Sequence, residues 1–176
     1  MSDSFQAFSH YKLSASEMIL LPLSVEYAQQ LCTWRYEPPY DLYNWPAWED
    51  MQKDEIEFGD PVLRHNQYAA IVNKQAVLIG FAQFFPIVGV TRIGLGLLPE
   101  LCGNGNGAVF AAFLAQEAGR RTPDNEIDLE VLTWNKRAIR AYEHAGFCIE
   151  DTYSRPVPSG PPEAEFHCMV YRPKSS

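Results

Sequence analysis

The stretch LCGNGNGAVF at residues 101–110 holds three glycines and two asparagines immediately before an apolar run. Ordering a glycine-rich loop loses much conformational entropy, so we expect a gain that offsets this loss. One interpretation is a turn that requires positive backbone angles. The other is a set of backbone N–H groups at the start of a helix, where the helix dipole also favours negative charge. On the second interpretation, the sequence predicts an anion-binding site made of backbone.

The same glycines formally fit the dinucleotide-binding pattern GxGxxA at 103–108. That pattern belongs at the first strand of a doubly wound sheet, and only about 70 residues follow it here, too few for the remaining strand–helix crossovers. A nicotinamide-dependent oxidoreductase is therefore a weak alternative, which would predict NAD binding. A P-loop is excluded because no Gly-Lys-Ser/Thr follows the glycines.

Residues 34–49, WRYEPPYDLYNWPAWE, combine three tryptophans and three tyrosines with prolines and acidic residues. The segment either covers the core as a packed loop, since aromatic residues pack as readily as they bind, or forms a lip that binds a substrate. In the second case Tyr36, Tyr40, Asp41 and Tyr43 would supply hydroxyl groups and charge. Exposed aromatics there could equally form the contact face of a homodimer.

Length and composition predict a single domain over 1–176, with residues 1–15 as a tail or ordered arm and the core at about 16–172. The net charge of −8 argues against nucleic acid and anionic membranes as partners and suits a cationic or amine-bearing one. The four cysteines and four histidines lack zinc-ligand spacing, so no metal site is predicted. Without a signal or membrane-spanning stretch, we expect a cytoplasmic protein with reduced thiols.

Hydrophobic periodicity and turn residues predict a mixed α/β chain whose first half is antiparallel. The expected strands are 18–23 (buried), 67–73, 77–87, 90–99, 126–134, 147–153 and 165–171, with a hairpin turn at 74–76 and a proline-rich loop at 154–164. The expected helices are 24–34, 48–57, 108–121 and 136–145. Asn135 should cap the last helix and Gly146 should end it, while Val109, Ala112 and Phe113 share one face of the preceding helix.

Two segments together resemble the GCN5-related N-acetyltransferases, the GNAT superfamily: PELCGNGNGAVFAAFL at 99–114 and LEVLTWNKRAIRAYEHAGF at 129–147. That family has Arg/Gln-x-x-Gly-x-Gly/Ala at a strand–helix junction. A strand, an Asn, a helix with Tyr seven residues after the Asn, and Gly-Phe follow. The matching positions are Gly105, Gly107, Asn135, Ala138, Tyr142, Gly146 and Phe147. The likeness is close over residues 90–153.

The resemblance implies the GNAT fold, an α+β arrangement with a mixed, mostly antiparallel twisted sheet of six to seven strands flanked by about four helices. It also implies acetyl-CoA as the cofactor, with its pyrophosphate on the backbone of the glycine loop. The pantetheine arm would lie between strands 90–99 and 126–134, and the first of these, broken by Gly94 and Gly96, should be bulged. The implied cofactor-binding residues are Leu95, Gly96, Leu97, Gly103, Asn104, Gly105, Asn106, Gly107, Ala108, Asn135, Arg137 and Tyr142.

Cys102 stands where the family has Arg or Gln, and the loop contains no basic residue. Lys136, Arg137 or Arg140 could neutralise the phosphates instead. A thiol at a helix N-terminus can have a lowered pKa and act as a nucleophile. No His or Asn partner is identifiable beside Cys102, so a structural role is favoured. Glu100 would repel phosphate if it faced inward, and we expect it to be solvated.

For catalysis, the resemblance implies that Tyr142 is the general acid, which protonates the leaving CoA thiolate, and that Glu130 is the general base. Tyr142 could instead be a core aromatic, and Glu130 could be structural. Asp128, Glu165 and His167 are rival bases.

Together these features predict an acetyl-CoA-dependent N-acetyltransferase that moves an acetyl group to a primary amine by direct attack. The acceptor would be a small amine or a protein amino group. The alternative is a degenerate acyl-CoA-binding sensor or partner-binding module without turnover, which the absent Arg or Gln leaves open.

Overall fold

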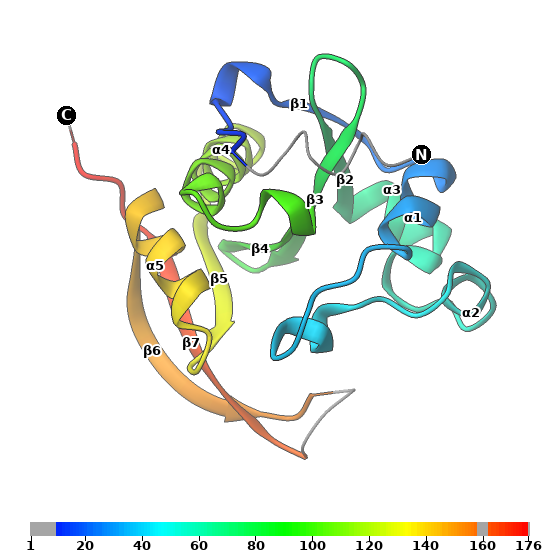
Figure 1. Cartoon of the computed structure of the whole chain (residues 1–176). Coiled ribbons are helices and arrows are strands. Elements are labelled where there is room, and N and C mark those ends of the chain that lie inside the picture. The colour runs from blue at the N-terminus through cyan, green and yellow to red at the C-terminus, as the bar shows by residue number, and fades with distance from the viewer. Residues whose placement is uncertain (1–9, 158–161, 176) are drawn as a thin grey trace.

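The chain folds around one seven-stranded mixed sheet, seen in a computed structural model that describes residues 10–157 and 162–175 (Figure 1). The strands are β1 (Ile19–Pro22), β2 (Tyr68–Val72), β3 (Leu78–Ile87), β4 (Val90–Leu97), β5 (Glu126–Leu132), β6 (Phe147–Arg155) and β7 (Ala164–Tyr171). Their order is β1-β2-β3-β4-β5-β7-β6, and among the described strands only the β4–β5 pair is parallel. This architecture confirms the predicted fold class.

Five α-helices flank the sheet in the described part of the chain, one more than expected. They are α1 (Val25–Leu31), α2 (Trp48–Lys53), α3 (Pro61–Gln67), α4 (Asn106–Arg121) and α5 (Lys136–Ala145). The unexpected helix is α3, although its start carries the usual signals. Asp60 accepts hydrogen bonds from the N–H groups of Val62 and Leu63, and Pro61 occupies the first position, where no N–H is needed.

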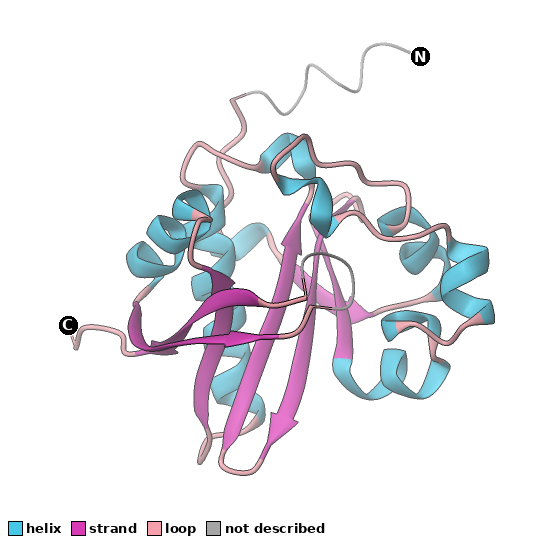
Figure 2. Ribbon diagram, turned by 90° about the horizontal axis from the view of Figure 1, so that it is seen from below, coloured by secondary structure: helices cyan, strands magenta, loops and turns pink. Residues whose placement is uncertain are grey.

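The sheet separates two hydrophobic layers (Figures 1 and 2). α4 and α5 pack on one face around Leu114 and Phe147, whereas α1 and α2 pack on the other around Leu31 and Met51. The buried face of α4 consists of Phe110, Ala111, Leu114, Ala115 and Ala118. Val109, Ala112 and Phe113 share a neighbouring face of α4, as expected, and their side chains are partly buried there.

The first strand and the N-terminal arm also differ from expectation. β1 is an edge strand whose residues are exposed or partly buried, so the expectation of a buried strand is wrong. Residues 1–9 lie outside the described residues. The arm that follows them packs against α4, because Leu13 is buried and its N–H donates to the Asn106 side chain at 2.8 Å. Of the expected proline-rich loop at 154–164, residues 158–161 also lie outside the described residues.

β4 and β5 diverge after a short parallel pairing and open a split in the middle of the sheet. Their pairing ends at Arg92 and Asp128, after which β5 pairs with β7 while β4 stays paired with β3. The expected bulge in β4 is wrong, because its register with β3 has no shift. Gly96 instead makes room for the ring of Phe81, with which a Cβ at that position would collide.

Candidate active site

A cavity of about 710 Å³ runs through the split and along the α1–α3 face of the sheet. Most of the residues singled out from the sequence line it: Tyr36, Tyr40, Tyr43, Leu95, Gly96, Leu97, Gly103, Gly105, Gly107, Ala108, Glu130, Asn135, Arg137 and Tyr142. Asp41, Asn104 and Asn106 are not among the lining residues. The fold therefore brings together residues from a strand, a glycine loop, a helix and the aromatic segment.

The glycine loop adopts left-handed backbone angles at three consecutive residues before α4. The φ angles are 91° at Gly103, 54° at Asn104 and 79° at Gly105, which caps the helix. A Cβ on either glycine would meet nothing within 4 Å, so the positive φ rather than crowding requires glycine there. Gly107 and Ala108, in the first turn of α4, line the pocket, and the first N–H groups of a helix have no acceptor within the helix. The loop is therefore a turn that requires positive backbone angles, and the same conformation is compatible with an anion-binding site at the start of α4.

Asn106 serves the fold rather than the pocket, as its side chain is 1% exposed. Its Oδ1 accepts from the N–H of Leu13, and its Nδ2 donates to the carbonyls of Tyr11 and Leu101. Any contact of Asn106 with a cofactor is therefore left to its backbone N–H, as the sequence predicts for the whole loop. The reason is that the buried face of α4 begins at this residue.

α5 turns two arginines and a histidine toward the pocket. Arg137, Arg140 and His144 all line it, and their spacing places them on one helical face. The Arg137 guanidinium lies 3.8 Å from the centre of the Tyr40 ring. Gly107 lets α4 approach this helix, because its Cβ would be 3.2 Å from that of Ala141. The positive charge missing from the glycine loop is thus available on α5.

Tyr142 lines the pocket from α5 and is half-buried. Burial raises the pKa of its hydroxyl well above the usual range, with further contributions from Tyr43 and Cys102 that Arg137 opposes. The phenol is therefore protonated at neutral pH, which is the form that a general acid needs.

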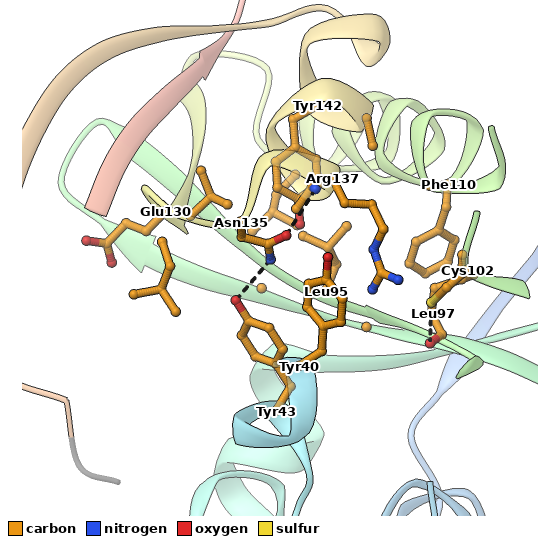
Figure 3. A pocket seen from close by; sticks show the side chains of 18 of the residues that line it. Tyr40, Tyr43, Leu95, Leu97, Cys102, Phe110, Glu130, Asn135, Arg137 and Tyr142 are labelled. Atoms are coloured by element: carbon orange, nitrogen blue, oxygen red, sulfur yellow. Dashed lines mark hydrogen bonds between the residues drawn. The ribbon is translucent and has the colours of Figure 1, made fainter. Parts of the chain in front are cut away.

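Asn135 joins the two walls of the pocket, as Figure 3 shows. Its Oδ1 accepts from the N–H of Ala138 at 3.2 Å, which confirms the predicted helix cap. Its Nδ2 donates to the Tyr43 hydroxyl at 3.1 Å. The aromatic segment is thereby tied to the start of α5, close to Tyr142.

The 3₁₀ turn Tyr40–Tyr43 explains which residues of the aromatic segment reach the pocket. Side chains three residues apart eclipse one another in a 3₁₀ helix, so Tyr40 and Tyr43 project to the same side (Figure 3). Asp41 points elsewhere and is exposed. The predicted contribution of Asp41 to an acceptor site is therefore not supported by the geometry.

Cys102 is held in the pocket wall as a protonated thiol. Burial raises its pKa, Arg137 opposes this shift and Glu100 adds to it. Its Sγ lies 3.8 Å from the carbonyl oxygen of Leu97, which also accepts from the Tyr36 hydroxyl at 2.7 Å. These contacts favour the structural role over the nucleophilic one. Glu100 is not fully solvated as expected, because its Oε2 is buried without a hydrogen-bond partner.

Glu130 stands at one end of the pocket in an ionic network, with its carboxylate directed away from Tyr142 (Figure 3). Its Oε1 lies 3.2 Å from Arg92, and its Oε2 accepts from Arg155 at 3.1 Å and from the Tyr153 hydroxyl at 2.5 Å. Taking a proton would require Glu130 to give up one of these contacts. The geometry therefore favours the structural role for Glu130.

The rival bases are also engaged or remote. Asp128 accepts two hydrogen bonds from Arg92, at 2.9 and 2.8 Å. His167 Nδ1 lies 2.7 Å from the Thr152 hydroxyl. Neither these two residues nor Glu165 lines the pocket.

Sequence reasoning missed the far wall of the cavity. Trp45, Glu57, Tyr68, Phe81 and Gln83 line it, and they come from four separate parts of the chain. Only the tryptophan fell within the aromatic segment singled out above. The others gave no local signal, since strand residues and a lone glutamate are common.

Among the described residues, no group of three or more His, Cys, Asp and Glu side chains could hold a metal ion. A search of the same residues finds no helix with the length and apolar character needed to cross a membrane.

Residues 28–147 match the family model described as "Acetyltransferase (GNAT) family", which covers more than half of the chain. The chain therefore belongs to the GNAT acetyltransferase family, a family of acyltransferase enzymes that use acetyl-CoA. Among curated proteins, no sequence matches the chain.

Solved structures share this fold at low sequence identity. A chimera of spermidine N-acetyltransferase SpeG from Vibrio cholerae and hSSAT has a TM-score of 0.68 and 15% identity, covering 89% of this chain and 95% of that one. The Vibrio cholerae spermidine N-acetyltransferase in complex with CoA and spermine has a TM-score of 0.64 and 16% identity, covering 88% and 95%. A GNAT-family acetyltransferase from Bacillus anthracis has a TM-score of 0.60 and 11% identity, covering 89% and 95%.

Proposed function

We propose that the protein is an acetyl-CoA-dependent N-acetyltransferase that acetylates a small primary amine by direct attack. The observation that carries the proposal is the split between β4 and β5, which opens beside the left-handed loop at the start of α4. Structural neighbours that act on spermidine, one of them solved with CoA and spermine, support an amine as acceptor.

The residues around the split fit acetyl-CoA. The N–H groups at Gly107 and Ala108 would hold its pyrophosphate, with Arg137 and Arg140 supplying positive charge. Leu98 N–H bonds to Ile79 in β3, so by alternation the backbone of Leu95 and Leu97 faces the split. When bound, acetyl-CoA supplies an activated thioester carbonyl for the amine to attack.

Tyr142 would donate its proton to the thiolate that leaves when the new amide bond forms, and the proton that the amine nitrogen loses would restore the Tyr142 hydroxyl. Tyr40 and Tyr43 would border the acceptor at the same place, since Asn135 holds Tyr43 beside α5. Glu130 would hold Arg155 and Arg92 in the pocket wall rather than take the proton of the amine.

Thermal unfolding with acetyl-CoA, CoA and NAD at equal concentrations tests the proposal. A ligand at about 100 times its dissociation constant adds roughly 2.7 kcal/mol to the free energy of unfolding, which raises Tm by several degrees. We expect both CoA species to raise Tm and NAD to leave it unchanged. Release of thiol with a panel of amines then measures turnover. A CoA-dependent shift without turnover on any amine would favour the acyl-CoA sensor instead.

A further inference from the structure

The cavity continues past the split to an aromatic wall formed by Trp45, Tyr68 and Phe81, which acetyl transfer itself does not require. The ring centres of Trp45 and Phe81 are 6.0 Å apart. All three rings pack around the fully buried Phe58, at centre distances of 4.8, 5.5 and 6.4 Å for Trp45, Tyr68 and Phe81. The wall is thus rigidly supported from behind while its front faces the cavity.

Glu57 adds a negative charge to this wall. Its Oε2 accepts from the Tyr68 hydroxyl at 2.6 Å, and within the described part of the chain no Lys, Arg or His forms an ion pair with it. Its φ is 46°, a left-handed angle that is unfavourable for a residue with a side chain. Tertiary structure therefore holds an unneutralised carboxylate at an aromatic surface that lines a cavity.

Two glycines connect this wall to the split. Tyr68, Gln83 and Gly94 lie directly opposite one another on β2, β3 and β4, so their side-chain positions share one face of the sheet. Neighbouring strands are about 4.8 Å apart, which places Tyr68 roughly 10 Å from β4. Gly94 and Gly96 line the cavity together with Gln83 and Phe81, whose side chains pack against them. Because one cavity contains both the split and the aromatic wall, an extended acceptor could lie along it with one end at each place.

We propose that Trp45, Tyr68, Phe81 and Glu57 form a subsite for a second cationic group of the acceptor, an ammonium or guanidinium group that binds roughly 10 Å from β4. Aromatic faces attract such cations, and a carboxylate supplies the opposite charge. The acceptor would then be an extended amine with two cationic ends. This inference rests on the proposed acetyl transfer and names the class of its acceptor.

Diaminohexane and aminohexanol provide a direct test, because they have equal length and differ in the second charge. We expect the wild-type protein to show a kcat/KM about tenfold or more higher for diaminohexane. Glu57→Gln should reduce this preference to about threefold or less by raising KM for the diamine, with little change for aminohexanol. Glutamine can still accept the Tyr68 hydrogen bond, so the fold should be retained, as circular dichroism would verify.

Glu55→Gln is the matched control. Glu55 also has a positive φ, 50°, is exposed and does not line the cavity, so its variant loses the same charge from the same segment. It should keep the wild-type preference for the diamine. Equal kcat/KM for the two acceptors in the wild type, or equal losses in the Glu55 and Glu57 variants, would overturn the subsite.

Fluorescence of Trp45 gives a readout that does not depend on turnover. The signal is the difference between the wild type and Trp45→Phe, titrated with diaminohexane and with aminohexanol. We expect saturable quenching by the diamine that Glu57→Gln weakens about tenfold. If no amine is acetylated, the proposed function fails while this titration still decides the subsite. If the diamine causes no saturable quenching, the subsite proposal is wrong even if amines are acetylated.

Discussion

The two ends of the cavity are built in opposite ways. The end proposed to bind acetyl-CoA relies mainly on backbone, supplied by the run Gly103–Ala108 at the start of α4. The end proposed to bind the acceptor uses side chains from 3₁₀, loop and strand segments that are far apart in sequence, such as Tyr43, Glu57 and Tyr68. A phosphate group has the same shape in every reaction, so a short sequence motif is enough to bind it. An acceptor differs from enzyme to enzyme, so the side chains that recognise it have to be brought together from separate segments by the fold.

The same contrast appears in the backbone strain at each end. Left-handed angles at the glycine loop fall on Gly103, Asn104 and Gly105, residue types for which they cost least. At the aromatic wall such an angle falls on Glu57, where a Cβ makes it unfavourable. The cofactor end therefore forms from local preference, while the acceptor end depends on packing.

The largest effect should come from Tyr142→Phe. Removing the hydroxyl removes the proton donor, so kcat should fall about hundredfold or more, with little change in the KM for acetyl-CoA. Tyr171→Phe is the matched control, since both tyrosine rings contact Phe147 but Tyr171 does not line the cavity. Steady-state kinetics of both variants checks the assignment, and an unchanged kcat in the Tyr142 variant would refute it.

The pH dependence of kcat should also reflect the role of Tyr142 as the general acid. The pKa of Tyr142 is raised by burial, so the hydroxyl keeps its proton as the pH rises through the usual tyrosine pKa of about 10. The kcat profile of the wild type should therefore show no loss from deprotonation of this acid below about pH 10. A loss near neutral pH that disappears in Tyr142→Phe would contradict the raised pKa.

An intermediate effect is expected for Gly105→Ala. The φ of 79° disfavours a Cβ, so the free energy of unfolding should fall by roughly 1–2 kcal/mol. Affinity for CoA should also fall, by about tenfold, because the N–H groups of the loop would shift. Gly89→Ala has nearly the same φ of 75° in the β3–β4 hairpin and is the control. The Gly89 variant should lose a similar amount of free energy of unfolding, measured by urea unfolding. Its affinity for CoA, measured by calorimetry, should equal that of the wild type.

The smallest effect is expected for Cys102→Ala. The buried thiol has a raised pKa and contacts carbonyl oxygens, so its loss should change kcat by no more than about twofold. Iodoacetamide at neutral pH should modify the exposed Cys148 well before Cys102, as peptide mass spectrometry would show. A hundredfold drop in kcat would instead revive the nucleophilic interpretation.

Much of the fold followed from local sequence. Ser24 and Asn135 cap the helices that they were expected to start, and Gly146 ends α5 with a φ of 111°. The family pattern that joins Gly105 to Tyr142 predicted acetyl-CoA chemistry, because those residues recur at fixed spacing on adjacent elements. The order of strands and helices was correct apart from α3, whose Asp60 cap was overlooked.

Other features could not be predicted from local sequence patterns, because they depend on contacts between distant segments. Gly96 suggested a bulge, but the structure uses it to admit Phe81, a residue on the neighbouring strand. Glu130 matched a family position, yet its oxygens are occupied by Arg92 from β4 and by Tyr153 and Arg155 from β6. Whether a carboxylate is available for proton transfer depends on which cations the sheet places beside it.

The sequence by itself determined the elements and the backbone loop, because capping, periodicity and positive φ at glycine act over a few neighbouring residues. Only the tertiary structure decided where the sheet splits and which side chains face the acceptor end. Strand pairing aligns Tyr68 with Gly94, and the 3₁₀ turn separates Asp41 from Tyr43. These placements arise from contacts between residues distant in the chain, whose distances the sequence does not record.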